Sequence, residues 1–212
     1  MLNRRTFISR TGIGVVAAVP ALIALPVGVA PPALASPAGD RASAFIKTMG
    51  EKLVAAINGS ESLQQRRQAL AGIIDAAVDV DGVARFCLGR FWVIATPAQQ
   101  QQYLSVFRNM LVVNISSKIG DYRGVRFTLG ATQDRDAGEI VSTIVERPNN
   151  PPANVQWVVA NAAADPKVVD VIAEGTSLRI TQRDDYTAFM SRNGNNVDAL
   201  LGAIRQQVSQ NG

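Results

Sequence analysis

The side chains that could do chemistry in this chain are carboxylates and hydroxyls, because its 212 residues include no histidine and one cysteine. Imidazole is the commonest general base near neutral pH and a frequent zinc ligand, so both roles lack their usual candidates. Cys87 lies between Phe86 and Leu88, a setting that predicts a buried thiol rather than a reactive one. The sequence therefore predicts no catalytic thiol, no disulfide within the chain, no metal site and no cofactor.

Carboxylates remain as candidates for acid and base chemistry, but their positions at predicted helix starts and strand ends indicate structural roles. Asp79 and Asp81 precede a predicted helix, where aspartate caps the N-terminus. Glu174 and Ser177 lie beside a predicted strand end, and glycine does not flank the serine on both sides as a nucleophile elbow requires. We predict no catalytic residue. A hydrolase that uses Asp79, Asp81, Glu174 or Ser177 stays open as the alternative.

Residues 1–35 are typical of an export signal rather than of a folded domain. An arginine pair, Arg4 and Arg5, precedes a mildly apolar stretch that Pro20 and Pro26 interrupt, so a membrane-spanning helix is a poor interpretation. The pair resembles a twin-arginine signal, and an ordinary secretory signal is the alternative. The small residues at 33–35 predict cleavage after Ala35, which leaves one domain over residues 36–212.

The basic charge of the chain belongs mostly to this signal. The whole sequence has 21 lysines and arginines against 17 acidic residues, and removing Arg4, Arg5 and Arg10 leaves a net charge of only +1. Binding to phosphate backbones needs a basic stripe, and none is visible in residues 36–212. We therefore expect no nucleic-acid partner.

The expected elements are helices first, then strands, then helices. Apolar spacing of three and four residues predicts helices, and a period of two after Gly120 predicts strands. Helices are expected over 42–57, 60–78 with Ser60 as cap, about 79–88, 96–120, 184–190 and 197–208; strands are expected over 125–129, 140–145, 155–159, 168–173 and 175–181. This order predicts an α+β fold, an antiparallel sheet of four to five strands that helices cover on one face.

Bulky apolar side chains concentrate in the stretch from Leu88 to Leu111. Thr96, Pro97 and Gln99 form the start of a helix with a capping box, and the glutamines that follow are its first solvated turn. Beyond them, Leu104, Phe107, Leu111 and Ile115 share one stripe, with Tyr103 and Met110 beside it. Such residues either fill an ordinary core or line a lipid-sized cavity, and composition does not decide between the two.

Two blocks of sequence resemble the MlaC, or toluene-tolerance, family of periplasmic phospholipid-binding proteins. The first comprises LGRFW at 88–92, ATPAQ at 95–99, Tyr103 and Phe107-Arg108; the second is DVIAEGTS at 170–177. Residues 81–92 also resemble the hopanoid-associated branch of this family. The likeness extends over residues 36–212, although residues 166–169 lack the aromatics of relatives, which bears on the shape of the cavity.

The resemblance implies a periplasmic lipid carrier with a curved sheet, an apolar cavity for acyl chains and no enzymatic activity. Its cargo would be phospholipid, with a hopanoid or other terpenoid lipid as the alternative. Its partners would be an inner-membrane ABC transporter with an MCE-domain protein and an outer-membrane lipoprotein, a system that maintains outer-membrane lipid asymmetry. We expect a monomer. Periodicity and resemblance together predict eight lining residues: Leu88, Phe91, Trp92, Phe107, Leu111, Ile144, Trp157 and Val171.

Overall fold

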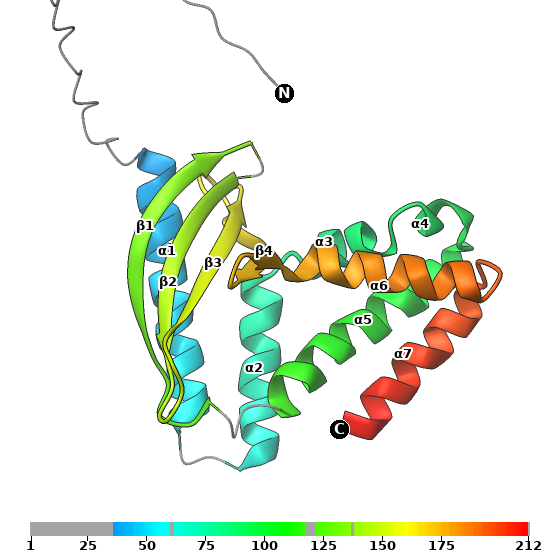
Figure 1. Ribbon diagram of the computed structural model, residues 1–212, viewed down its shortest axis with the longest axis horizontal. Coiled ribbons are helices and arrows are strands. Elements are labelled where there is room, and N and C mark those ends of the chain that lie inside the picture. Colours follow the sequence, from blue (N-terminus) through cyan, green and yellow to red (C-terminus); the bar gives the residue numbers. More distant parts are fainter. Residues whose placement is uncertain (1–35, 60–61, 118–121, 137, 212) are drawn as a thin grey trace, which may run out of the picture. The chain divides into compact units, whose positions relative to one another are not determined.

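The computed structural model describes residues 36–211 except 60–61, 118–121 and 137. The predicted export signal lies outside the described residues, as does Ser60, the predicted cap. Five strands form one antiparallel sheet in the order β1-β2-β3-β4-β5, and seven helices occur in the described part of the chain (Figure 1). The predicted α+β class and strand number are confirmed.

Most helix boundaries follow from caps that the sequence contains. Ser36 caps α1, whose first residue is Pro37, so this helix begins five residues before the predicted start. Ser62 and Gln65 form a capping box at α2, and Thr96 and Gln99 form the predicted one at α5. The helices before the sheet are α1 (Pro37–Asn58), α2 (Leu63–Ala77), α3 (Val80–Leu88), α4 (Phe91–Ile94) and α5 (Pro97–Ser117).

Consecutive strands pair as a meander. The strands are β1 (Arg126–Arg135), β2 (Gly138–Glu146), β3 (Ala153–Ala160), β4 (Lys167–Ala173) and β5 (Thr176–Ser177). The register shifts between Leu129 and Thr132 of β1 and again between Val158 and Val159 of β3. Such irregularities increase the local bend of a strand, and Figure 1 shows the long β1 and β2 strands curved.

The prediction of a strand over 175–181 is wrong beyond its first residues. Ser177 ends β5 and caps α6, since its Oγ accepts from the backbone N–H of Ile180 at 3.2 Å. A serine in that position starts a helix rather than continuing a strand. The two helices after the sheet are α6 (Leu178–Arg192) and α7 (Val197–Asn211).

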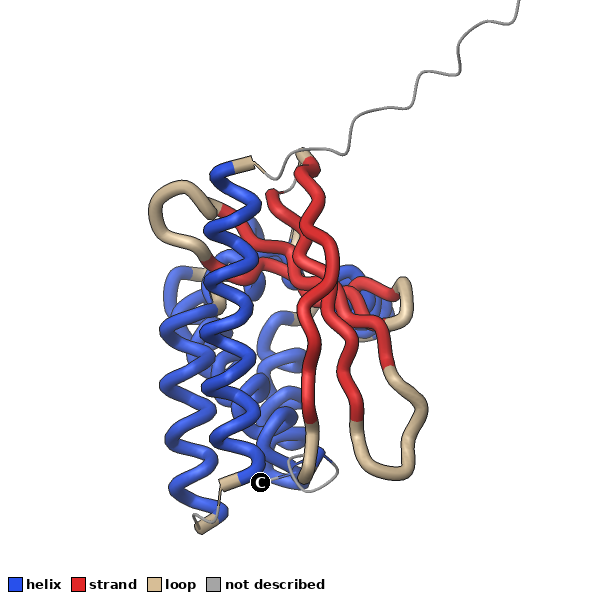
Figure 2. The backbone as a smooth tube through the Cα atoms, turned by 90° about the vertical axis from the view of Figure 1, so that its left-hand side faces the viewer, coloured by secondary structure: helices blue, strands red, loops and turns tan. Residues whose placement is uncertain are grey.

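Two apolar clusters account for most of the core. The first joins α3, α4, α5, α6 and α7. The second lies between α1 and the sheet, around Ala42, Ile46 and Val141. Helix α2 runs beside α1 (Figure 2) and meets the sheet where Val78 forms a parallel bridge with Val168. Within the described ranges, no helix is both long enough and apolar enough to cross a bilayer.

Candidate functional site

One face of the sheet is turned toward α1, and we call it the inner sheet face. The register places Val141, Trp157 and Val171 side by side on it, with Thr143 and Val155 in the next row. The ring of Phe127, from β1, lies so close to Gly50 of α1 that a Cβ added there would come within 2.3 Å of it. Helix α1 therefore packs directly on the β1 side of this face.

Several apolar side chains of the inner sheet face are only half-buried. Val141 is fully buried, whereas Leu129, Val155, Trp157 and Val171 keep part of their surface accessible. Apolar surface of this kind gains free energy when a further apolar group covers it, about 25 cal/mol per Å². An apolar ligand that binds to these half-buried residues would therefore cover the part of their surface that the protein leaves accessible to water.

Trp157 is held on the inner sheet face by a short chain of hydrogen bonds. Its indole Nε1–H donates to Thr143 Oγ1 at 3.0 Å, and the hydroxyl of Thr143 donates to the carbonyl oxygen of Val155 at 3.0 Å. Thr143 is buried, with 2% of its surface exposed. Because the only polar atom of the indole is thus satisfied by the protein, the rest of the ring offers a purely apolar contact.

The structure places Leu88, Phe91 and Phe107 inside the helical cluster rather than beside open space. None of the three exposes more than 2% of its surface. Tyr103, which the lining prediction omitted, lies at their centre: its hydroxyl donates to the carbonyl oxygen of Ala84 at 2.8 Å, and its ring contacts those of three other aromatic residues. These side chains pack on one another and hold α3, α4 and α5 together.

The remaining predicted lining residues lie in different places. Trp92 and Leu111 are half-buried at the margin of the helical cluster, and Trp157 and Val171 lie together on the inner sheet face. Ile144 pairs with Thr128 and Asn154 on the opposite face and is 44% exposed. Successive strand residues point to opposite faces, so Ile144 does not share a lining with Trp157.

Three of the four side chains of the hydrolase alternative, those of Asp79, Glu174 and Ser177, are engaged in caps and turns. Asp79 accepts from the N–H of Gly82 at 2.9 Å, and Glu174 accepts from the N–H of Asn154. Asp81 is exposed in the first turn of α3, and Ser177 caps α6. The described ranges contain no group of three or more histidine, cysteine, aspartate or glutamate residues that could hold a metal ion.

Asp170, in the second block of family-like sequence, joins three elements. Its carboxylate is 6% exposed and accepts hydrogen bonds from Ser177 Oγ at 2.6 Å and from the backbone N–H groups of Val171 and Arg179. The guanidinium of Arg179 lies 3.5 Å from the same carboxylate and over the ring of Phe86. The sequence analysis did not predict this role. The available signal was Asp170 followed, after a tight turn, by Ser177 and Arg179.

Arg108, in the first block, joins α5 to α2. Its Nε donates to Asp75 Oδ1 at 2.7 Å, and a second nitrogen binds the other carboxylate oxygen. This hydrogen bond lowers the pKa of Asp75 and raises that of Arg108. Both side chains are more than 40% exposed, so the pair contributes little to stability at moderate salt.

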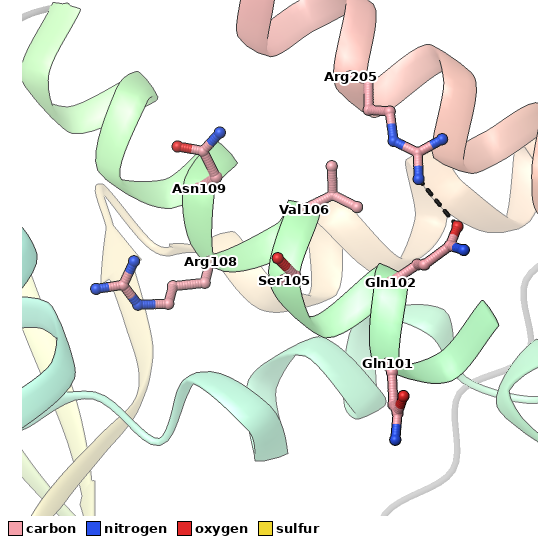
Figure 3. A pocket seen from close by; sticks show the side chains of 7 residues that line it. All are labelled: Gln101, Gln102, Ser105, Val106, Arg108, Asn109 and Arg205. Carbon is pink, nitrogen blue, oxygen red and sulfur yellow. Dashed lines mark hydrogen bonds between the residues drawn. The ribbon is translucent and has the colours of Figure 1, made fainter. Parts of the chain in front are cut away.

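A pocket of about 600 Å³ between α5 and α7 is polar and differs from the inner sheet face. Figure 3 shows Arg205 directed at Gln102, to which it donates at 2.9 Å, while Gln101 points away. Six of its seven lining residues are polar, a poor match for an acyl chain.

The prediction that the glutamines form a solvated first turn needs one correction. Gln100 is half-buried, and its side-chain amide donates to the carbonyl oxygen of Trp92 at 2.9 Å.

The arrangement is an α+β fold whose antiparallel sheet has a half-covered apolar face, and comparison with known proteins identifies its family. The family model described as MlaC protein matches residues 47–206. The chain belongs to the MlaC family.

Two relatives are similar over most of the chain. Toluene tolerance protein ttg2D from Pseudomonas putida is 26% identical over 144 residues, which cover 67% of each protein. The structure of a phospholipid-binding protein from Ralstonia solanacearum, solved in complex with a phospholipid, superposes with a TM-score of 0.71 at 24% identity. The match covers 80% of this chain and 97% of the Ralstonia protein, so the fold is shared.

Proposed function

We propose that this protein is a periplasmic carrier that binds the acyl chains of a phospholipid against its inner sheet face. The observation that carries the proposal is the set of half-buried apolar residues around Trp157, which the protein's own side chains cover incompletely. Membership of the MlaC family and the shared fold with a structure that contains a phospholipid support it.

The energetics fit a carrier. Burying a methylene group is worth about 0.8 kcal/mol, so two chains of roughly sixteen carbons represent on the order of 25 kcal/mol of apolar burial that free transfer through water would lose. A carrier must offer comparable burial and needs no catalytic group, because transfer changes no covalent bond. This agrees with the engagement of Asp79, Glu174 and Ser177 in caps and turns.

The partners we propose are an inner-membrane ABC transporter with an MCE-domain protein and an outer-membrane lipoprotein, between which the protein would shuttle as a monomer. Residues 1–35 would direct export and be removed after Ala35. A hopanoid is the alternative cargo, because the inner sheet face selects apolar surface rather than a particular head group. Cleavage after Ala35 predicts Ser36 as the first residue of the exported protein, and mass spectrometry of that protein tests the prediction.

The test of carrier function compares two faces of one sheet. The mature chain and the variants Trp157→Ala and Ile144→Ala are purified, and lipid is extracted and measured by mass spectrometry. The unsubstituted chain should contain about one lipid, Trp157→Ala should lose most of it, and Ile144→Ala should keep it, because Ile144 lies on the opposite face. Circular dichroism confirms folding. Absence of lipid from the unsubstituted chain, together with no uptake from vesicles, contradicts the proposal.

The same preparations distinguish a carrier from a hydrolase. Asp79→Asn and Glu174→Gln each remove one of the carboxylates that the hydrolase alternative could use. A carrier should transfer intact lipid between vesicles at an unchanged rate in both variants. Lipid fragments that appear with the unsubstituted chain and vanish with either variant would establish an enzyme instead.

A further inference from the structure

The short helix α4 exposes two aliphatic side chains that the protein does not cover. Val93 is 85% exposed and Ile94 is 57% exposed, while Phe91 and Ala95 on the same turn are buried and anchor it. Trp92 is half-buried beside them. Figure 1 shows α4 at the edge of the helical part, remote from the sheet. We call Val93 and Ile94 the α4 tip.

Two arginines flank the α4 tip. The guanidinium carbon of Arg85 lies 5.1 Å from the centre of the Trp92 ring, and that of Arg90 lies 4.9 Å from the centre of the Phe91 ring. Both arginines are exposed, and within the described residues no carboxylate lies within 4.0 Å of either guanidinium. The aromatic contacts fix these positive charges beside the aliphatic tip.

The chain segment that carries the α4 tip contains no acidic residue. No aspartate or glutamate occurs between Asp81 and Asp121, a stretch that includes the end of α3, all of α4 and all of α5. Exposed aliphatic residues next to a tryptophan and unpaired arginines are the pattern of a segment that rests in the interface of an anionic bilayer. The aliphatic groups enter the acyl boundary and the guanidinium groups remain among the phosphates.

We propose that the α4 tip docks on the surface of an anionic lipid bilayer, with Val93 and Ile94 inserted and Arg85 and Arg90 on the lipid phosphates. A bilayer fits better than a protein groove because a single helical turn offers little shape for a partner to recognise, whereas insertion requires only apolar surface beside positive charge. Two aliphatic side chains give weak and reversible attachment, which lets the protein leave the membrane. The docking is independent of the cargo on the inner sheet face.

The test measures binding of the mature chain to vesicles by flotation. Vesicles of phosphatidylglycerol and phosphatidylcholine are compared with phosphatidylcholine alone, and we expect binding to the anionic vesicles that high salt weakens. Val93→Ser/Ile94→Ser should lower the partition coefficient on the order of tenfold. Arg85→Gln/Arg90→Gln should lower it on the order of tenfold on anionic vesicles, since each cation near such a surface is worth several-fold.

A matched control uses two exposed aliphatic residues elsewhere. Leu178 and Ile180 of α6 are 51% and 49% exposed, and Leu178→Ser/Ile180→Ser should leave vesicle binding unchanged. Insertion is read separately from a fluorophore on Val93→Cys, because the buried Cys87 will not react in the folded protein. Its emission should shift to the blue on anionic vesicles.

Two results would overturn the docking proposal. One is an unsubstituted chain that does not bind anionic vesicles. The other is a loss of binding in the Leu178/Ile180 control as large as that in the Val93/Ile94 variant. Lipid content, measured on the same samples, separates this from the carrier proposal: failure to carry lipid with intact vesicle binding contradicts the carrier proposal alone.

Discussion

At the scale of single residues, Asp170 shows how one buried carboxylate holds β4, β5 and α6 together. Replacing it with alanine leaves Arg179, whose side chain is 23% exposed, with an uncompensated charge. We expect Asp170→Ala to lower the free energy of unfolding by about 3 kcal/mol. The measurement is urea denaturation followed by circular dichroism.

The matched control for this prediction is Asp165→Ala. Asp165 pairs with Lys167 at 3.5 Å, but its side chain is 78% exposed, so its loss should cost less than about 1 kcal/mol. Equal effects of the two substitutions would show that the network around Asp170 contributes no more than a surface ion pair.

The thiol of Cys87 gives a prediction on pH. Burial raises its pKa from 9.0 to about 12, so in the range from 9 to 12 the unfolded chain ionises at this position while the folded one stays protonated. The protonated thiol therefore favours the folded state, and this contribution is lost as pH rises above 9. We expect the free energy of unfolding to fall with rising pH, and less steeply in Cys87→Ala.

The slope of the free energy of unfolding against pH must be compared between the unsubstituted chain and Cys87→Ala, because burial also raises the pKa values of Tyr103 and Tyr186. These two shifts also lower the stability as the pH rises. Iodoacetamide labelling offers a second measurement: Cys87 should react slowly in the folded protein at pH 8 and rapidly in urea. Rapid labelling of the folded protein, or identical slopes in both chains, would contradict the burial argument.

The candidate site could be predicted only in part, for a reason visible at Ile144. Strand β2 has apolar residues on both faces, Ile140 and Ile144 on one, Val141 and Val145 on the other, so alternation alone does not identify the inner face. That choice depends on α1, which packs against Phe127 through Gly50. Trp157 could be found from sequence because the residues that alternate with it are largely polar.

At the scale of elements, the contact between α1 and β1 depends on a glycine. A Cβ at position 50 would lie 2.3 Å from the ring of Phe127, so either the ring must turn away or the helix and strand must separate. We expect Gly50→Ala to lower the free energy of unfolding by about 1–3 kcal/mol, despite the better helix propensity of alanine. Denaturation in urea measures the change.

Gly72, in the middle of α2, supplies the control because no atom outside its own stretch of helix backbone lies within 4 Å of the position that a Cβ would take. Gly72→Ala should stabilise the protein by about 0.5–1 kcal/mol. A second substitution, Phe127→Leu, should restore part of the stability lost in Gly50→Ala. Stabilisation by Gly50→Ala, as by Gly72→Ala, would contradict the close packing.

Sequence periodicity located most elements but not the short ones. The capping box at Thr96 and the glycine stop at Gly89 have clear signals, and both are confirmed. Helix α4 was not predicted, because one turn is too short to show a helical period. Helix α6 was assigned too late in the chain since Leu178 and Ile180 alternate as in a strand, although Ser177 caps a helix.

At the scale of the whole molecule, the proposed function predicts that stability depends on bound lipid, because lipid would cover the half-covered inner sheet face. A ligand that binds only the folded state stabilises it by about 2.7 kcal/mol at a hundred times its Kd. Removing bound lipid should therefore lower Tm by roughly 5–10 °C in a domain of this size. Calorimetry before and after extraction measures the shift, and readdition of phospholipid should reverse it.

Trp157→Ala provides the control for this prediction. A variant that cannot hold lipid should show the same Tm before and after extraction, whereas Ile144→Ala should behave like the unsubstituted chain. If extraction leaves Tm unchanged in the lipid-bearing protein, the inner sheet face does not contribute to cargo binding.

The direction of the α4 tip depends on Gly89, where α3 ends with φ +57° and ψ −130°. These angles are the mirror image of an extended conformation that L-residues adopt without strain. A D-amino acid would therefore adopt them without strain, whereas an L-residue with a side chain would be strained. The missing side chain at this one α carbon, together with the burial of Phe91 and Ala95, thus sets the direction in which Val93 and Ile94 project.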